Sequence, residues 1–397
     1  MKTTKKVPTL RFPEFEGEWG KKQLREVCDV IMGSSPKSSS YNENNYGLPL
    51  IQGNADITNR VTTPRIYTSE ITKTCDLGDI LLSVRAPVGS VAKSNHHACI
   101  GRGVCTIKSS EVSEFVYQFL INFEKKWGRL SQGSTFDSIN RSDIESIFIS
   151  IPSFPEQQKI ADCLTAMDDT IEAQQQKVEQ LQAYKKGLLQ QLFSQTLRFP
   201  GFEGEWEEKK LGEVLLSVTT GLNPRDNFIL GDGDNFYITI KNIKNGKLYL
   251  ETAEKIDNAA TQTINKRSDL RAGDVLFSSI GNVGDMYIIE EDPKKWNINE
   301  SVFSLRPNTN SITSKQLYYS IQNPAFMNLL RSGVTGSTFK SVKIGFLKNI
   351  KLDLPSLPEQ QKIADCLSTL DEVIELEQQK LEKLQVYKKG LLQQLFV

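Results

Sequence analysis

The chain contains much of its sequence twice. Segment 9–19 recurs almost unchanged as 196–206, and a longer block, 151–193, recurs as 354–396 with 31 identities in 43 positions. At 397 residues the chain is also too long for one ordinary hydrophobic core. The repeat therefore predicts two copies of one structural unit.

The segments between the repeated blocks, 28–150 and 215–353, differ almost completely but keep the same order of turns. Both contain a glycine loop (33–37 and 221–225), a Gly-Asp turn at Gly78 or Gly273, a later Val-Gly pair and a Gly-Ser-Thr-Phe element (133–136 and 336–339). Short apolar runs between these turns predict strands, and one helix precedes each Gly-Ser-Thr-Phe, at about 112–130 and 314–331. We expect two copies of a mixed α/β fold with divergent surfaces.

The long repeated block predicts a helix. Ser153 with Glu156, and Ser356 with Glu359, have the spacing of a capping box, and proline is tolerated in the first turn. Apolar residues then recur at four and three positions, which is typical of a coiled-coil seam broken once by Gln174 or Glu377. The seam residues are Ile160, Leu164, Met167, Ile171, Val178 and Leu181 in the first copy, and Ile363, Leu367, Leu370, Ile374, Leu381 and Leu384 in the second.

Chain geometry predicts that the two helices pair antiparallel. The first helix leads almost directly into segment 196–206, so the second domain follows its C-terminal end. A helix of about 40 residues is ~60 Å long, whereas a domain of ~140 residues has a radius of gyration near ~14 Å. A parallel second helix would have to start too far from its own domain. We therefore expect a dumbbell with a pseudo-two-fold axis.

Composition indicates a globular protein and does not decide the ligand. Lysine plus arginine and aspartate plus glutamate both number 48, which argues against nucleic-acid binding by bulk attraction but not against local basic clusters. No apolar run follows the basic N-terminus, and no stretch approaches the ~18 apolar residues of a membrane span. Six cysteines without a CxxC pair fit reduced thiols. These features predict a cytoplasmic protein.

Two doubled motifs carry a family resemblance. Pro-Glu-Gln-Gln-Lys-Ile occupies 155–160 and 358–363, and Tyr-Lys-Lys-Gly-Leu-Leu-Gln-Gln-Leu-Phe occupies 184–193 and 387–396. With the Gly-Asp and Gly-Ser-Thr elements, the chain resembles the specificity subunit of type I restriction–modification enzymes along essentially its whole length. The first copy departs from the second at 85–89, where it has Arg-Ala-Pro-Val-Gly and the second copy has Ile-Gly-Asn-Val-Gly at 280–284.

The resemblance implies an α+β, non-catalytic subunit with two mixed α/β target-recognition domains and two long antiparallel helices. The implied segments are a first recognition domain 1–150 (opening repeat 8–27), a central helix 151–194, a second recognition domain 195–353 (opening repeat 195–214) and a distal helix 354–397. Each domain would read one half of a bipartite, asymmetric site in double-stranded DNA. The helices would set the spacing and dock two methyltransferase subunits, with motor–nuclease subunits completing the restriction complex. That complex is expected to need S-adenosylmethionine, ATP and Mg, with no cofactor bound by this chain.

Candidate contacts follow from residue type and position. Reading DNA requires cations and hydrogen-bonding groups on loops. The DNA candidates are Lys37, Arg85, Arg102, Lys126, Ser134, Thr135, Arg141, Arg225, Lys241, Lys244, Ser337, Thr338, Lys340 and Lys343. Tyr41, Tyr46 and Trp127 could stack on bases or pack internally. Polar residues that recur off the seam are candidates for partner docking: Gln157, Gln158, Lys185, Lys186, Gln360, Gln361, Lys388 and Lys389.

Competing functions have weaker support. The sequence lacks a GxxxxGK[ST] phosphate loop, and Asn-Pro-Ala-Phe at 323–326 fits a helix-ending turn better than an adenine-methyltransferase motif. Glu-Lys-Lys at 124–126 and 208–210 matches only half of a nuclease motif. His96, His97, Cys99 and Cys105 fit no standard zinc spacing. A purely structural coiled-coil scaffold would leave the two elaborate domains unexplained, and loss of specific DNA binding would favour it.

Overall fold

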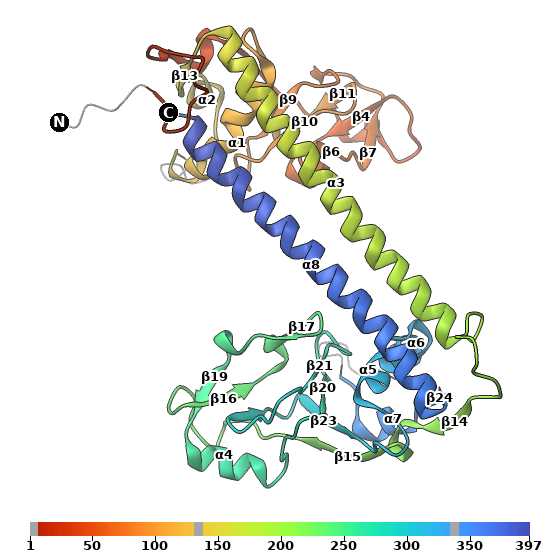
Figure 1. Ribbon diagram of the computed structural model, residues 1–397. Helices are drawn as coiled ribbons and strands as arrows, with labels where there is room; N and C mark the ends of the chain where they lie inside the picture. The colour runs from red at the N-terminus through yellow and green to blue at the C-terminus, as the bar shows by residue number, and fades with distance from the viewer. Residues whose placement is uncertain (1–6, 131–137, 334–340) are drawn as a thin grey trace. The chain divides into compact units, whose positions relative to one another are not determined.

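The structure is a computed structural model that describes residues 7–130, 138–333 and 341–397 (Figure 1). It divides into two compact units. Unit 1 comprises Met1–Gln176 and Gln378–Val397, and unit 2 comprises Lys177–Glu377. The division falls inside the two long helices, so each helix contributes one half to each unit. The four predicted segments follow the sequence repeat instead and stay a prediction about recognition and docking.

Unit 1 is built from short strands, two helices of its own and parts of the two long helices. Its strands are β1 (Gly20–Gln23), β2 (Cys28–Met32), β3 (Tyr41–Asn42), β4 (Leu48–Ile51), β5 (Ile57–Thr58), β6 (Val61–Thr62), β7 (Ile66–Thr68), β8 (Thr74–Cys75), β9 (Ile80–Ser83), β10 (Val91–Lys93), β11 (Ala98–Ile100), β12 (Val104–Ser109) and β13 (Phe148–Ile151). Its helices are α1 (Ser113–Leu130) and α2 (Arg141–Glu145), with parts of α3 (Phe154–Phe193) and α8 (Leu357–Leu395).

Three sheets form in unit 1. The largest has the order β2-β12-β9-β10-β6-β5, the second has the order β3-β7-β4-β11-β8, and β1 pairs with β13. Strands β4 and β11 run parallel, as do β6 and β10, and the other pairs are antiparallel. Helix α1 covers the large sheet with Phe115, Val116 and Leu120, which are fully buried beside Ile80 and Ile107.

Unit 2 repeats this plan with its own strands and helices. They are β14 (Glu207–Lys210), β15 (Leu215–Thr220), β16 (Asn235–Ile238), β17 (Ile243–Lys244), β18 (Lys247–Leu248), β19 (Glu254–Ile256), α4 (Asn258–Asn265), β20 (Val275–Ser278), β21 (Met286–Ile288), β22 (Trp296–Ile298), β23 (Val302–Pro307), α5 (Ser314–Gln322), α6 (Pro324–Ser332), α7 (Ile344–Asn349) and β24 (Lys351–Leu354).

The sheets of unit 2 repeat strand orders found in unit 1, whose two larger sheets additionally contain β6, β5, β3 and β8. The order β15-β23-β20-β21 matches β2-β12-β9-β10, β19-β16-β22 matches β7-β4-β11, and β14 pairs with β24 as β1 pairs with β13. In both units this second sheet contains one parallel pair, β4 with β11 in unit 1 and β16 with β22 in unit 2. The prediction of two copies of one mixed fold is confirmed.

The long helices pack antiparallel within each unit. In unit 1, Ile160 and Leu164 from the start of α3 lie in one cluster with Leu391 and Leu395 from the end of α8. In unit 2, Leu189 and Leu192 from the end of α3 lie with Ile363 and Leu367 from the start of α8. The predicted seam and the predicted helix direction are therefore confirmed in both units.

One predicted helix is divided in the structure. The expected helix over about 314–331 consists of α5 and α6, which meet at Asn323. The Asn323 side chain accepts a hydrogen bond from the Ala325 N–H (3.2 Å), and Pro324 opens α6. Proline is favoured in a first turn, so the Asn-Pro pair both ends one helix and starts the next.

None of the helices in the described ranges has an apolar stretch long enough to cross a membrane. All six cysteines carry free thiols, four of them buried. Burial raises the pKa of Cys28 to about 11 and that of Cys105 to about 12, so both thiols stay protonated near neutral pH.

Candidate nucleic-acid interface

In unit 1, loops at one end of the six-stranded sheet are joined by backbone hydrogen bonds. The bonds run from Gly33 N–H to Val104 O (3.0 Å), Gly103 N–H to Gln52 O (3.0 Å), Val84 N–H to Gly103 O (2.9 Å) and Ile139 N–H to Val84 O (3.0 Å). We call the joined segments 33–37, 52–53, 84–87, 101–103 and 138–139 the first loop edge. Segments far apart in sequence thus present their side chains together.

Unit 2 joins the corresponding loops in the same way. The bonds run from Gly221 N–H to Asn299 O (3.3 Å), Asn299 N–H to Ile238 O (3.0 Å), Ser279 N–H to Ser301 O (2.9 Å) and Val342 N–H to Ser279 O (2.9 Å). We call segments 221–225, 239–242, 279–282, 299–301 and 341–343 the second loop edge. The two edges share a backbone framework and differ in the side chains that they carry.

The first glycine of each matched loop is required by close packing. A Cβ atom at Gly33 would lie 2.1 Å from the Gly101 carbonyl oxygen, and one at Gly221 would lie 1.5 Å from the Ile298 carbonyl oxygen. These are backbone atoms that cannot move aside, so only glycine fits. The glycines explain why both loops keep this residue although the rest of each loop has diverged.

The loop edges hold six of the predicted DNA contacts with exposed side chains. These are Lys37, Arg85 and Arg102 on the first edge and Arg225, Lys241 and Lys343 on the second. The Arg102 N–H donates to Ser35 Oγ (3.1 Å), which ties Arg102 to the loop that carries Lys37. Cations on joined loops form a surface suited to the phosphate backbone.

The other predicted contacts lie elsewhere or outside the described residues. Arg141 opens α2 and pairs with Glu145 (2.6 Å), the Lys126 ammonium lies 5.2 Å from the Phe123 ring centroid on α1, and Lys244 sits beside the turn of the β17–β18 hairpin. Ser134, Thr135, Ser337, Thr338 and Lys340 lie outside the described residues. Arg85 forms an antiparallel bridge with Ser138, immediately after the first of these segments.

The aromatic candidates separate by burial. Trp127 is fully buried and packs against Gly89, so it belongs to the core. The Tyr41 hydroxyl donates to the Pro36 carbonyl (3.1 Å) and supports the loop that carries Lys37. Tyr46 is 71% exposed and is the only one of the three aromatic candidates with its ring largely in solvent.

Sequence reasoning missed amide side chains on both edges. Gln52 lies on the first edge beside Gly53, and Asn282 lies on the second between Gly281 and Val283. Amide groups are well suited to the adenine edge because they donate and accept together. The available signal was a polar amide next to glycine in a divergent loop.

The Gly-Asp elements hold the fold together and are not exposed reading groups. Asp79 accepts the N–H of Asp76 (2.8 Å), and Asp274 accepts the N–H of Arg271 (3.0 Å), closing the same turn before β9 and β20. Asp274 is buried and also binds Arg306 (2.8 Å). The bond to Asp274 holds the pKa of Arg306 above its usual value.

The candidate docking residues divide into internal and exposed groups. Gln157 and Gln360 are each 1% exposed, so their assignment to a docking surface is corrected. Gln157 binds Val112 N–H (3.2 Å) and Pro152 O (3.1 Å), and Gln360 binds Thr313 N–H (3.1 Å) and Pro355 O (3.1 Å). Their recurrence reflects the same internal bonds made twice.

Two repeated lysines also act inside the units. Lys185 pairs with Asp371 (2.5 Å), and its repeat mate Lys388 pairs with Asp168. Both ammonium groups are largely covered. The exposed matching residues that remain are Gln158, Lys186, Gln361 and Lys389, accompanied by Tyr184 and Tyr387 at 62% and 59% exposure.

The family assignment rests on both halves of the chain. The model of the type I restriction modification DNA specificity domain matches residues 16–183 and again 203–386. The chain belongs to this family. It is a specificity subunit, the non-catalytic class that the sequence predicted, and the α+β prediction is confirmed with it.

Known specificity subunits resemble this one to different extents. A putative type I restriction enzyme MjaX specificity subunit from Methanocaldococcus jannaschii is 38% identical over 202 residues, covering 50% of this chain and 47% of that protein. The alignment thus spans about half of that relative. The MjaIX specificity subunit of the same organism is 25% identical over 409 residues, covering 95% and 92%. The crystal structure of an S subunit from M. genitalium has a TM-score of 0.61 at 18% identity over 98% and 99% of the two chains, which shows the fold.

The residues considered for catalysis have structural partners in this specificity subunit. Glu124 binds Arg60 (2.7 Å) and Glu208 binds Lys351 (2.6 Å). His96 Nδ1 lies 2.9 Å from Thr62 Oγ1, and His97 lies 2.8 Å from Asp76. In the described part of the chain no group of three or more histidine, cysteine or acidic side chains is arranged to hold a metal ion.

Proposed function

We propose that this specificity subunit recognises a bipartite, asymmetric site in double-stranded DNA, each loop edge reading one half. One observation carries the proposal: matched backbone hydrogen bonds join the same loops in both units, yet the exposed side chains on those loops differ. A shared frame with different contacts is what two readers of different sequences need.

The chemistry of each edge fits the grooves and backbone of DNA. Lys37 and Arg225 occupy matching positions of the glycine loops and are suited to phosphate oxygens. Arg85 and Arg102 can bind guanine, and Gln52 and Asn282 can bind adenine, through paired hydrogen bonds in the major groove. If both units face one side of a duplex, the half-sites should centre about one helical turn apart, ~10 bp.

The exposed repeated residues support docking of a partner. Gln158, Lys186 and Tyr184 recur as Gln361, Lys389 and Tyr387 on α3 and α8, although among the described residues no side-chain hydrogen bond requires the tyrosines to match. Two equivalent surfaces suit two copies of one subunit. We propose that these copies are methyltransferase subunits, that the helices set the gap between the half-sites, and that motor–nuclease subunits complete the complex. S-adenosylmethionine, ATP and Mg would be used by those subunits.

Methylome sequencing tests this proposal directly. Cells carrying the chain with its methyltransferase should modify two short specified sequences separated by an unspecified gap. A second strain, in which residues 215–353 are replaced by the corresponding segment of another specificity subunit, should change one half-site and keep the other. A continuous or palindromic motif, or a change in both half-sites, would contradict it.

A further inference from the structure

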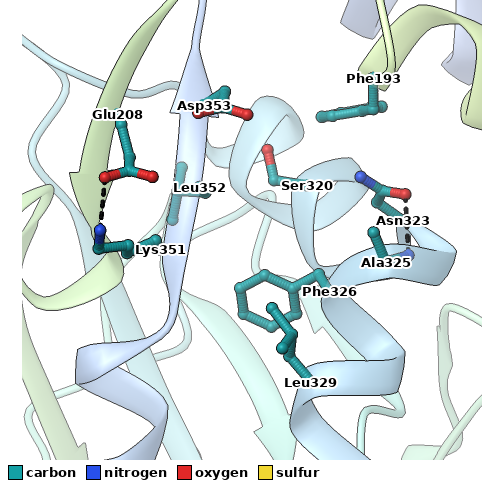
Figure 2. A pocket seen from close by; sticks show the side chains of 10 residues that line it. All are labelled: Phe193, Glu208, Ser320, Asn323, Ala325, Phe326, Leu329, Lys351, Leu352 and Asp353. Carbon is teal, nitrogen blue, oxygen red and sulfur yellow. Dashed lines mark hydrogen bonds and ion pairs between the residues drawn. The ribbon is translucent and has the colours of Figure 1, made fainter.

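Unit 2 contains a cavity of about 330 Å³ between helices α5 and α6 and strand β24 (Figure 2). We call it the α6 pocket. Its lining residues are Phe193, Glu208, Ser320, Asn323, Ala325, Phe326, Leu329, Lys351, Leu352 and Asp353. The Asn-Pro-Ala-Phe segment, which the DNA-reading role leaves unused, thus forms one wall.

Unit 1 fills the equivalent place with its own aromatic rings. The ring of Phe396 lies 5.1 Å from that of Phe115 and 6.1 Å from that of Phe119, and Phe119 lies 5.8 Å from Phe123. Phe396 is the repeat mate of Phe193. Unit 1 therefore joins its sheet core and the helix ends in one hydrophobic cluster.

The three phenylalanines have no aromatic counterparts in unit 2. Gln157 and Gln360 bind Val112 and Thr313, which sets the alignment of α1 with α5 and α6. In that alignment Gln316 takes the place of Phe115, Ser320 that of Phe119 and Pro324 that of Phe123. Unit 2 accordingly has two separate clusters, one with Phe326 and Leu352 and one with Phe193, and all three residues line the pocket.

The pocket combines an apolar wall with an acidic rim. Glu208 and Asp353 are direct partners across the β14–β24 pair. The Lys351 ammonium pairs with the Glu208 carboxylate (2.6 Å). The side-chain carboxylate of Asp353 has no hydrogen-bond or ion-pair partner among the described residues. Figure 2 shows Asp353 and Glu208 at the same side of the opening, with Phe326 and Leu329 below them. One carboxylate is therefore left to bind a cation.

We propose that the α6 pocket receives an arginine side chain from the methyltransferase subunit that docks on unit 2, an inference that rests on the proposed function. The aliphatic stem would lie along Phe193, Phe326 and Leu329, and the guanidinium would pair with Asp353. Arginine suits the site because its planar group stacks on aromatic rings and binds carboxylates with two donors. Phe193 follows the exposed repeat residues Gln190 and Gln191 with only Leu192 between them, and it lies at the end of α3 that also carries the exposed Tyr184 and Lys186.

The corresponding place in unit 1 would reject the same arginine. Lys21 occupies the position of Glu208 and lies 4.3 Å from the ring centroid of Phe148, which replaces Lys351. Ser150 replaces Asp353, and Lys125 replaces Phe326. Unit 1 therefore has a filled, cationic surface at this place and unit 2 has an open, acidic one, so the two docking positions are not equivalent in their contacts.

Native mass spectrometry of the specificity subunit titrated with its methyltransferase tests this inference. Asp353→Asn should weaken one of the two binding events about tenfold, the loss of one charged interface contact. Ser320→Phe, which fills the pocket as Phe119 does in unit 1, should weaken the same event. The control Ser150→Ala, at the mate of Asp353, should leave both events unchanged.

The outcomes separate the inference from the proposed function. If the wild-type chain binds no methyltransferase, the docking proposal fails. If the wild-type chain binds two copies and Asp353→Asn alters neither binding event, or alters both equally, the pocket inference is overturned. Because the Asp353 side chain is exposed, we expect Asp353→Asn to fold as the wild type does. Replacing one particular arginine of the methyltransferase should weaken binding as much as Asp353→Asn does, and combining the two changes should weaken binding no further. If the effect of every arginine substitution adds fully to that of Asp353→Asn, the inference is overturned.

Discussion

A buried carboxylate fastens the opening repeat of each unit to the start of a long helix. Glu156 accepts two hydrogen bonds from Arg11 (both 2.8 Å), and Glu359 accepts two from Arg198 (2.7 and 2.9 Å). The capping-box prediction placed these carboxylates at the helix start but paired them with the wrong group. The partner lies 145 or 161 residues away, and no local pattern indicates it.

Replacing Glu156 by glutamine should lower the free energy of unfolding by about 2 kcal/mol, because it removes charge-assisted hydrogen bonds at a side chain that is 2% exposed. Glu359→Gln should cost less, since Trp19 also donates to Glu156 (3.2 Å) whereas the buried Trp206 indole N–H has no partner among the described residues. Urea denaturation followed by tryptophan fluorescence measures both. Equal stability of Glu156→Gln and wild type would contradict the role of this pair.

Single loop cations should affect one half-site each. Lys37→Ala should weaken binding of the assembled complex about tenfold and reduce the salt dependence by about one ion, because it removes one phosphate contact. Arg225→Ala should do the same through the other half-site. Fluorescence anisotropy with DNA carrying one intact half-site assigns each effect. Lys294→Ala, with its side chain 82% exposed away from the loop edges, is the control and should bind as wild type does.

At the scale of elements, apolar spacing predicted the seam of α3 and α8 because that pattern is local. The contacts that complete the helix pair were not predictable in this way. Lys185 binds Asp371 and Lys388 binds Asp168, so residues assigned to a partner are used between the helices. Similarly, the loop edges depend on backbone bonds between distant segments. Residue type alone grouped Lys126, Arg141 and Lys244 with the edge cations, although these three residues lie outside the edge segments.

Lengthening both helices should change the gap and nothing else. Four residues inserted after Gln174 and four after Glu377 add about 6 Å to each helix, since the rise is ~1.5 Å per residue. At ~3.4 Å per base pair, the gap should grow by one or two base pairs. Methylome sequencing reads the result. Altered half-sites with an unchanged gap would show that the helices are not the spacer.

At the scale of the whole molecule, the repeat in the sequence predicted two matching units, and the strand orders of the units confirm it. In the sequence, the divergence between the units was visible only as low identity between segments 28–150 and 215–353. The structure gives it a physical form, because Phe119 fills in unit 1 the place that Ser320 leaves open in unit 2. A comparison of aligned letters cannot show which substitution opens a cavity until the helices are placed against the strands.

The repeated exposed residues predict one specificity subunit for every two methyltransferase subunits. Lys186→Glu and Lys389→Glu, made singly, should each reduce the complex to one bound methyltransferase, and the double variant should bind none. Native mass spectrometry measures these masses. A fully active complex with a single methyltransferase on the wild-type chain would show that the repeated surfaces are not paired docking sites.

The bond between Leu10 N–H and Gln394 O (3.0 Å) has an equivalent in Leu197 N–H and Gln191 O (3.2 Å), where only Ser194 and Gln195 separate the helix from the next repeat. In each unit the opening repeat is therefore held against the end of a long helix by the same backbone bond, whether or not the two segments follow one another in sequence. Two residues joining Phe396 to Thr9, with new termini opened at Ser194, should give a permuted chain that folds and directs the same methylation motif. Loss of the motif in a chain with native circular dichroism would show that the order of the two halves carries information of its own.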